Sequence, residues 1–101
     1  MGTASWVLAG PTSGANDAFS SSCHGAGRRL SRTAARKSID SVSLKKTLES
    51  RGIHVHVKTP NVLSEEAPDA YKDVDEVIRL TAEAGLARPV ARLRPVAVIK
   101  G

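Results

Sequence analysis

The sequence has one cysteine, few aromatic residues and no long apolar run, and each shortage excludes a class of protein. Because Cys23 is alone among the 101 residues, the chain can form neither an internal disulfide nor a two-cysteine metal clamp. No segment approaches the roughly 20 apolar residues of a membrane span, and the first residues lack the basic and apolar regions of a signal peptide. We therefore expect a cytoplasmic protein without a membrane partner.

Aromatic residues make up only 3% of the chain, which leaves few large side chains for a core. A single domain of 101 residues also buries only about 60 to 65% of the surface that its unfolded chain exposes. The sequence therefore predicts marginal stability, or stability that depends on a partner.

Charge is distributed unevenly along the chain, whose formal net charge is +5. Residues 24–58 hold nine Lys or Arg against two acids, residues 59–85 hold seven acids against two cations, and residues 86–101 hold four cations and no acid. Clustered cations attract phosphates and polynucleotides through counterion release. An RNA partner is therefore feasible, although such a basic run is as often an ordinary solvated helix face.

Short patterned segments predict an α+β fold of irregular strands and short helices in one domain. The apolar run at 4–9 is typical of a strand, and the segment 10–22, rich in Gly, Ser, Asn, Asp and Pro, is typical of a loop. Good helix formers at 28–37 predict a helix that begins at Arg28, with Arg28, Arg32 and Arg36 on one face.

Further elements follow from capping and alternation. Ser43 is expected to cap a helix over 44–50 that ends before Gly52, and residues 53–58 alternate like a half-buried strand.

The acidic segment is followed by a helix and an extended stretch. Asp73 and Glu76 resemble a capping box at the start of a helix that Gly85 ends. Residues 89–99 are predicted to be extended, with an interruption at Pro95.

The most informative stretch is residues 22–32, Ser-Cys-His-Gly-Ala-Gly-Arg-Arg-Leu-Ser-Arg. Gly25 and Gly27 permit a tight backbone near a ligand, while Arg28 and Arg32, with the start of the following helix, would attract an anion. A neutral His24 imidazole could attack phosphorus and form a phosphoramidate. On composition and spacing alone, however, a histidine beside glycine is more often an ordinary turn residue.

Four separated motifs resemble those of the RtcB family of GTP-dependent RNA ligases. The string HGAGRRLSR at 24–32 resembles that family's H-G-A-G-R-x-x-S-R signature, and residues 1–5 resemble the second half of its G-S-M-G-x-x-S stretch. Residues 66–75 resemble E-x-P-x-A-Y-K-D-x-D, and residues 100–101 match a terminal K-G. Together these matches cover nearly the whole chain in the same order.

The resemblance implies a role for individual residues. His24 would be the guanylylated nucleophile, and Arg28 and Arg32 would hold the RNA phosphate. The GMP or GTP site would consist of Met1, Ser5, His24, Gly25, Ala26, Gly27, Tyr71 and Lys100, with Tyr71 beside the guanine.

The resemblance also implies a reaction and its partners. In this family a histidine takes GMP from GTP with manganese present and passes the GMP to an RNA 3′-phosphate. A 5′-hydroxyl then displaces the GMP and seals the strand. Ends with a 2′,3′-cyclic phosphate are first opened to 3′-phosphate. The RNAs would be tRNA halves or broken RNA ends, and the archease activator protein is a candidate partner. Because the family's proteins are longer and bind metal in their amino-terminal portion, we expect residues 1–101 to be a carboxy-terminal portion, inactive alone and without metal ligands.

Other interpretations stay open. His54 and His56 could form a metal-ligand pair, but a solvated polar face opposite Ile53, Val55 and Val57 is the favoured interpretation. Cys23 is expected to be a small buried residue rather than a ligand. The chain could also be a non-catalytic phosphate or RNA-binding module, or a segment that does not fold by itself.

Overall fold

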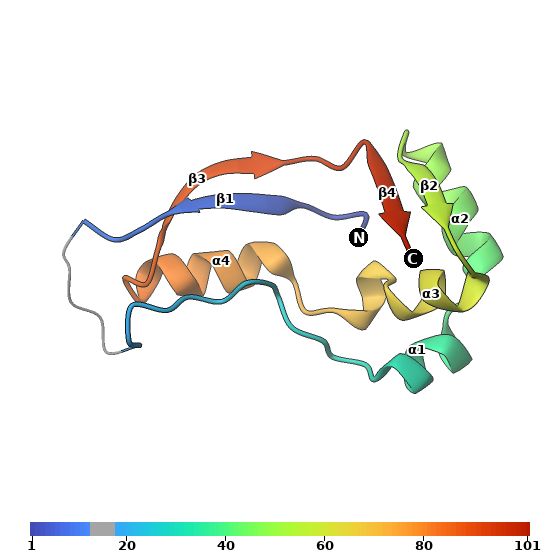
Figure 1. The fold of residues 1–101 in the computed structure, drawn as a ribbon, viewed down its shortest axis with the longest axis horizontal. Helices are drawn as coiled ribbons and strands as arrows, with labels where there is room; N and C mark the ends of the chain where they lie inside the picture. The colour runs from blue at the N-terminus through green and yellow to red at the C-terminus, as the bar shows by residue number, and fades with distance from the viewer. Residues whose placement is uncertain (13–17) are drawn as a thin grey trace.

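The molecule is elongated, with two groups of elements side by side (Figure 1). The structure is a computed structural model that describes residues 1–12 and 18–101, so the predicted loop at 10–22 lies partly outside the described residues. Its extents are 46 × 27 × 21 Å and its radius of gyration is 15.5 Å, compared with about 13 Å for a compact domain of 100 residues. The chain therefore packs as two lobes.

The first lobe consists of β1 (Ser5–Ala9), β3 (Arg88–Leu93) and α4 (Val74–Glu83). The two strands pair antiparallel, with an irregularity in register between Val7 and Leu8. Asp75 on α4 joins the helix to both strands, because it accepts a hydrogen bond from Trp6 Nε1 at 2.8 Å and pairs with Arg92 at 2.9 Å.

The second lobe contains the apolar core. Its elements are α1 (Arg32–Ser38), α2 (Ser41–Ser50), β2 (His54–Val57), α3 (Pro60–Glu65) and β4 (Ala97–Lys100). β2 and β4 pair in parallel. Leu48, Ile53, Leu63 and Val98 form the buried cluster, against which Met1 packs.

The α+β prediction is confirmed, but the start of the first helix was wrong. α1 begins at Arg32 rather than Arg28, because the Ser31 hydroxyl caps it by accepting a hydrogen bond from the Ala34 amide at 3.1 Å. Residues 28–30 instead pair with the backbone at Ala70 and Tyr71. Arg28 therefore does not share a helix face with Arg32 and Arg36.

Two further elements differ from expectation in the second lobe. Asp40, not Ser43, caps α2, and its carboxylate accepts a hydrogen bond from the Ser43 amide at 2.8 Å. A helix was not predicted at α3, where Pro60 occupies the first turn and needs no amide partner. The six-residue length of α3 gives its apolar residues too little periodicity to stand out.

The remaining boundaries agree with the sequence. The Asp73 carboxylate caps α4 by accepting hydrogen bonds from the amides of Asp75 and Glu76, while the Glu76 side chain pairs with Arg79. Gly85 has a left-handed φ of +71° where the helix ends. β3 and β4 lie on either side of Pro95, as its missing amide proton predicts.

No helix in the described part of the chain is long and apolar enough to cross a membrane.

The packing of α2 gives a stability prediction. Leu48 is 1% exposed, whereas Val42 on the same helix is 61% exposed. Leu48→Ala should lower the free energy of unfolding by about 2 to 5 kcal/mol, because it leaves a cavity in the core, and Val42→Ala should change it by less than about 0.5 kcal/mol. Urea denaturation of the chain measures both, and equal effects would contradict this core.

Candidate functional site

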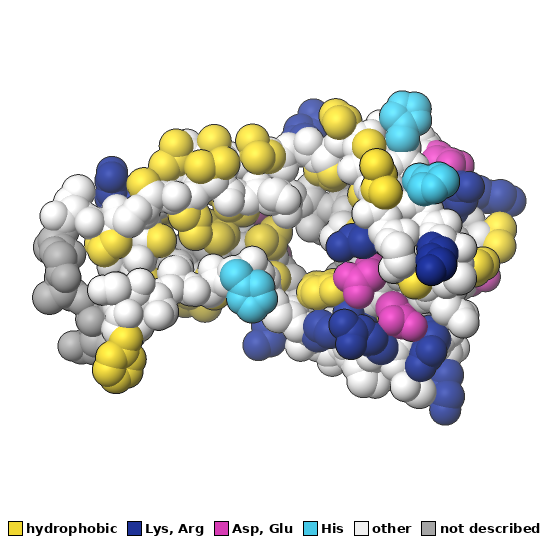
Figure 2. All heavy atoms as spheres, viewed as in Figure 1, with side chains coloured by type: hydrophobic (Ala, Val, Ile, Leu, Met, Phe, Trp, Pro, Cys, Tyr) yellow, Lys and Arg dark blue, Asp and Glu magenta, His cyan; other side chains and the backbone are white. Residues whose placement is uncertain are grey.

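A cleft of about 1220 Å³ lies between the two lobes, and Figure 2 shows the molecule hollowed there. Nine of the ten site residues predicted from the sequence line it, and Arg32 does not. The nine are Met1, Ser5, His24, Gly25, Ala26, Gly27, Arg28, Tyr71 and Lys100. Residues from distant parts of the sequence therefore meet around one hollow.

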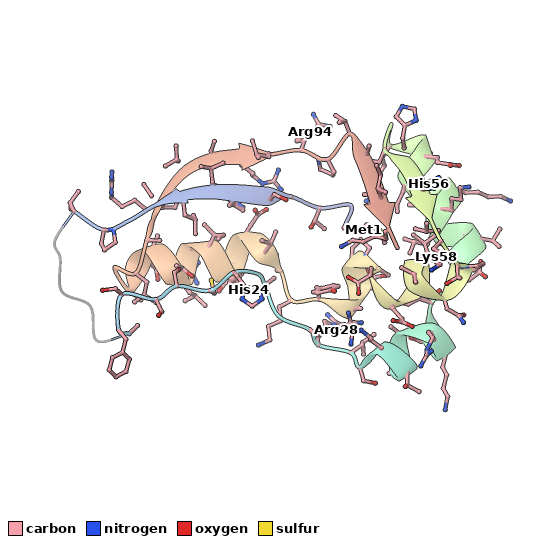
Figure 3. All side chains as sticks on the ribbon, viewed as in Figure 1. Met1, His24, Arg28, His56, Lys58 and Arg94 are labelled. Atoms are coloured by element: carbon pink, nitrogen blue, oxygen red, sulfur yellow. The ribbon has the colours of Figure 1, made fainter. Side chains whose placement is uncertain are left out.

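His24 lies in the connection that precedes α1 (Figure 3), and its side chain is exposed. The imidazole forms no hydrogen bond or ion pair with any residue that the structure describes. Just before it, Cys23 places its sulfur 3.3 Å from the Thr81 hydroxyl on α4. Cys23 is exposed rather than buried, which corrects the expectation. The ring nitrogens of His24 are thus without a partner among the described residues, and the residue before it contacts the first lobe through Thr81.

The glycine loop differs from the predicted phosphate cradle. Gly27 has a φ of +78°, a conformation that favours glycine, and its carbonyl accepts a hydrogen bond from the Lys72 amide at 3.0 Å. The helix whose free amides were expected to face the anion begins only at Arg32, outside the lining of the cleft. Any anion would therefore meet the loop and its neighbouring side chains instead of a helix start.

Arg28 is held by the residues around it. Its Nη1 donates to the Tyr71 hydroxyl at 2.8 Å and approaches Glu66 Oε1 at 3.4 Å, while its Nε donates to the Leu30 carbonyl at 3.0 Å. Its Nη2 donates to the Glu65 carbonyl, and its Cζ lies 4.8 Å from the centre of the Tyr71 ring. The predicted roles of Arg28 and Arg32 in holding an RNA phosphate stay predictions.

Glu66 and Tyr71 complete this network through a hydrogen bond of 2.6 Å from the tyrosine hydroxyl to the carboxylate. That hydrogen bond lowers the pKa of Glu66, with Lys100 and Arg28 adding favourable charge. Burial is the main cause that raises the pKa of the Tyr71 hydroxyl, followed by its bond to Glu66. The carboxylate is therefore stabilised in its ionised form and the phenol in its neutral form.

Several cations in the cleft were not singled out from the sequence. Arg29, Arg51 and Lys72 line it and pair with no carboxylate in the described part of the chain. Two of them, Arg29 and Arg51, belong to the basic run between residues 28 and 51. That run indicated positive charge, but it could not distinguish a cation in the cleft from one that faces solvent elsewhere. Asp69 also lines the cleft and partly offsets their charge.

The other predicted contacts come from separate elements. Met1 packs against the core cluster, Ser5 begins β1, and Lys100 ends β4. Arg32 lies 3.7 Å from the Glu65 carboxylate, which Arg36 also contacts. Arg32 therefore contacts Glu65 outside the lining of the cleft.

Manganese, which the resemblance implies, does not fit this chain's own residues. Among residues 1–12 and 18–101, no group of three or more His, Cys, Asp or Glu could hold a metal ion. His54 and His56 are exposed on β2, where they alternate with Val55 and Val57, which pack against the core. The interpretation of these histidines as a solvated polar face is confirmed by that alternation.

Comparison with known proteins identifies relatives over the whole chain. The sequence profile of the family described as tRNA-splicing ligase RtcB matches residues 1–101. The chain is 50% identical over 101 residues to the "tRNA-splicing ligase RtcB" of Pyrococcus abyssi, 48% to that of Methanopyrus kandleri and 52% to that of Thermococcus kodakarensis. All of this chain is covered, but only 11%, 10% and 21% of the respective relatives.

These relatives are tRNA-splicing ligases by name, so the class of protein is a ligase family. The chain belongs to the RtcB family of tRNA-splicing ligases. It spans about a tenth to a fifth of the length of the relatives that it matches.

The Glu66 network gives a pH prediction. A carboxyl whose pKa is lower in the folded than in the unfolded chain stabilises the fold above its ordinary pKa, and the contribution is lost as the pH falls. The ordinary value for Glu66 is 4.5. The difference in unfolding free energy between the wild type and Glu66→Gln should therefore be largest at neutral pH and shrink once the pH falls below that value.

Urea denaturation at a series of pH values measures this difference. Glu49→Gln is the matched control, because Glu49 is half exposed and pairs only with Lys45 at 3.8 Å, so its removal should have little effect. A difference for Glu66→Gln that stays constant down to acid pH would contradict the ionised network.

Proposed function

We propose that this chain supplies the guanylylated histidine and part of the GTP site of an RNA ligase that joins 3′-phosphate or 2′,3′-cyclic phosphate ends to 5′-hydroxyl ends. The observation that supports the proposal best is the meeting of four separated motifs in one cleft around an exposed imidazole that has no partner among the described residues. The exposed His54 and His56 lie outside this cleft, whereas a nucleotide in the cleft could reach His24.

The proposed reaction transfers GMP twice. A ring nitrogen of His24 attacks the α-phosphorus of GTP, a P–N bond forms, and the bond to pyrophosphate breaks. An oxygen of the RNA 3′-phosphate then displaces the imidazole and takes the GMP, and a 5′-hydroxyl attacks that activated phosphate, so that GMP leaves and the strand is sealed. Ends with a cyclic phosphate are hydrolysed to 3′-phosphate first.

The residues of the cleft would share the binding of the nucleotide. Gly25, Ala26 and Gly27 would lie along its phosphates, Tyr71 offers a ring face for the guanine, and Lys100 offers a cation for a purine oxygen or a phosphate. Met1 and Ser5 would contact the same GMP. Ligands for manganese are proposed to lie in the portion of the relatives that this chain does not span, as is any surface for the archease activator.

A chimera tests the histidine. The chain would replace the matching segment of the Thermococcus kodakarensis relative, with which it is 52% identical. With α-labelled GTP and manganese, this chimera should become covalently labelled, His24→Ala should remain unlabelled, and the 101-residue chain alone should not react. His56→Ala is the matched control, because His56 is an exposed histidine outside the cleft. Equal labelling with and without His24 would refute the proposal.

A second candidate function is a module that binds RNA phosphates without catalysis. Arg29, Arg51 and Lys72 favour it, because three cations that pair with no carboxylate in the described part of the chain concentrate positive potential around one hollow. The two candidates differ in their readout: the module would bind RNA in a salt-dependent manner, while the chimera would take up no label.

Salt dependence identifies the cations that contact RNA. For a single-stranded RNA oligonucleotide, removal of each contacting cation should reduce the slope of log K against log salt by about 0.7. Arg29→Gln and Lys72→Gln should show this change in fluorescence anisotropy titrations. Arg94→Gln and Lys37→Gln remove cations outside the cleft and should leave the slope unchanged. Identical slopes for all four variants would exclude the cleft as the RNA contact.

A further inference from the structure

We infer that Arg28, Glu66 and Tyr71 form a positioning clamp that fixes the backbone next to His24. Their main contribution is then to the step in which His24 takes GMP, not to the binding of an RNA phosphate. The inference rests on the proposed function of His24 as the nucleophile. It revises the role that the sequence resemblance implies for Arg28.

Every nitrogen of the Arg28 guanidinium already donates a hydrogen bond. Nε, Nη1 and Nη2 each donate to a protein acceptor: the Leu30 carbonyl, the Tyr71 hydroxyl and the Glu65 carbonyl, respectively. The side chain is 24% exposed and also lies against Glu66. An RNA phosphate that bound two nitrogens of the guanidinium at once would have to displace at least one of these contacts. This costs more than binding to Arg29, which pairs with no carboxylate among the described residues.

The backbone beside the guanidinium is held as well. The amides of Arg29 and Leu30 both donate to the Ala70 carbonyl, at 2.9 and 3.2 Å, and the Lys72 amide donates to the Gly27 carbonyl at 3.0 Å. Three main-chain hydrogen bonds thus join the segment after the histidine to residues 70–72. The side chains of the clamp add hydrogen bonds from Arg28 to Glu66 and Tyr71, and from Tyr71 to Glu66.

His24 therefore lies between two fixed points. Upstream, the Cys23 sulfur contacts Thr81 on α4, and downstream the clamp begins at Gly27 and Arg28. A Cβ at Gly25 or Gly27 would meet no other atom within 4 Å, so packing does not restrain these glycines. The end points must supply the restraint, and a misplacement of about 1 Å at a reacting group can slow a reaction by about 100-fold.

Conservative substitutions separate the clamp from a simple charge. Arg28→Lys keeps the cation but loses the planar fork, which lysine cannot reproduce in three directions. Glu66→Gln keeps the shape but offers one acceptor oxygen where Arg28 and Tyr71 use two. Tyr71→Phe keeps the ring face for the guanine and removes only the hydroxyl that joins the other two residues.

The experiment measures the first step alone. In the chimera with the Thermococcus kodakarensis relative, labelling of His24 by α-labelled GTP is followed without RNA over a range of GTP concentrations. Each of the three substitutions should slow labelling at saturating GTP by about 10-fold to 100-fold, with little change in the GTP concentration that gives half the maximal rate. Arg36→Gln removes an arginine that pairs with Glu65 outside the cleft, and it should label at the wild-type rate.

The two roles of Arg28 give opposite results. A residue that only held the RNA phosphate would leave labelling at the wild-type rate and impair sealing alone, and that outcome would overturn the inference. Labelling of both Arg28→Lys and Glu66→Gln at close to the wild-type rate would also overturn it. Thermal transitions near that of the wild type show that a slowed variant is folded.

Hydrogen exchange in the 101-residue chain tests the clamp even if the proposed chemistry fails. Arg28→Lys and Glu66→Gln should accelerate exchange of the Arg29, Leu30 and Lys72 amides, whereas Arg36→Gln should not. An unlabelled wild-type chimera with this exchange pattern would reject the proposed function and retain the clamp. Unchanged exchange in every variant would reject the clamp itself.

Discussion

The short contact between residues 27–30 and residues 70–72 is the constraint on which the rest of the site depends. Its hydrogen bonds join the histidine loop of one motif to the residues on either side of the tyrosine of another. The loop and the tyrosine line the same cleft as Lys100.

The electrostatics of the cleft follow from which cations already have partners. Arg28 and Arg92 are neutralised by Glu66 and Asp75, and both therefore act as structural links. Arg29, Arg51 and Lys72 pair with no carboxylate among the described residues. A cleft with both kinds of cation can be rigid and remain attractive to phosphates, because the residues that stiffen it differ from those that face the ligand.

Local signals in the sequence were sufficient for much of the fold. Asp73 and Gly85 marked the ends of α4, and Pro95 marked the break between β3 and β4, because each acts through its own backbone or a neighbour's. The start of α1 was wrong because Arg28 has good helix propensity, yet its partners Glu66 and Tyr71 lie 38 and 43 residues away. Propensity contains no information about such distant pairing.

The site was predicted less completely than its motifs. The resemblance identified nine residues that line the cleft, since motif letters are visible without coordinates, but it could not reveal which arginine is engaged. Glu66 is the first residue of the motif at 66–75, but the sequence assigned it no role. Its carboxylate has a function only in the folded chain, where Arg28 and Tyr71 contact it. Arg32 shows the converse: it belongs to the same motif as Arg28 but lies outside the lining of the cleft, where it approaches Glu65 on α3.

The pairing order of the strands has a consequence for how the site comes into existence. β1 pairs with β3 and β2 pairs with β4, so each two-stranded sheet joins segments that are far apart along the chain. Such non-local contacts require the entropy of large loops to be lost before any pairing is gained, and they slow folding. Arg92 of β3 and Lys100 of β4 line the hollow around the imidazole, so it is complete only when both strands have docked.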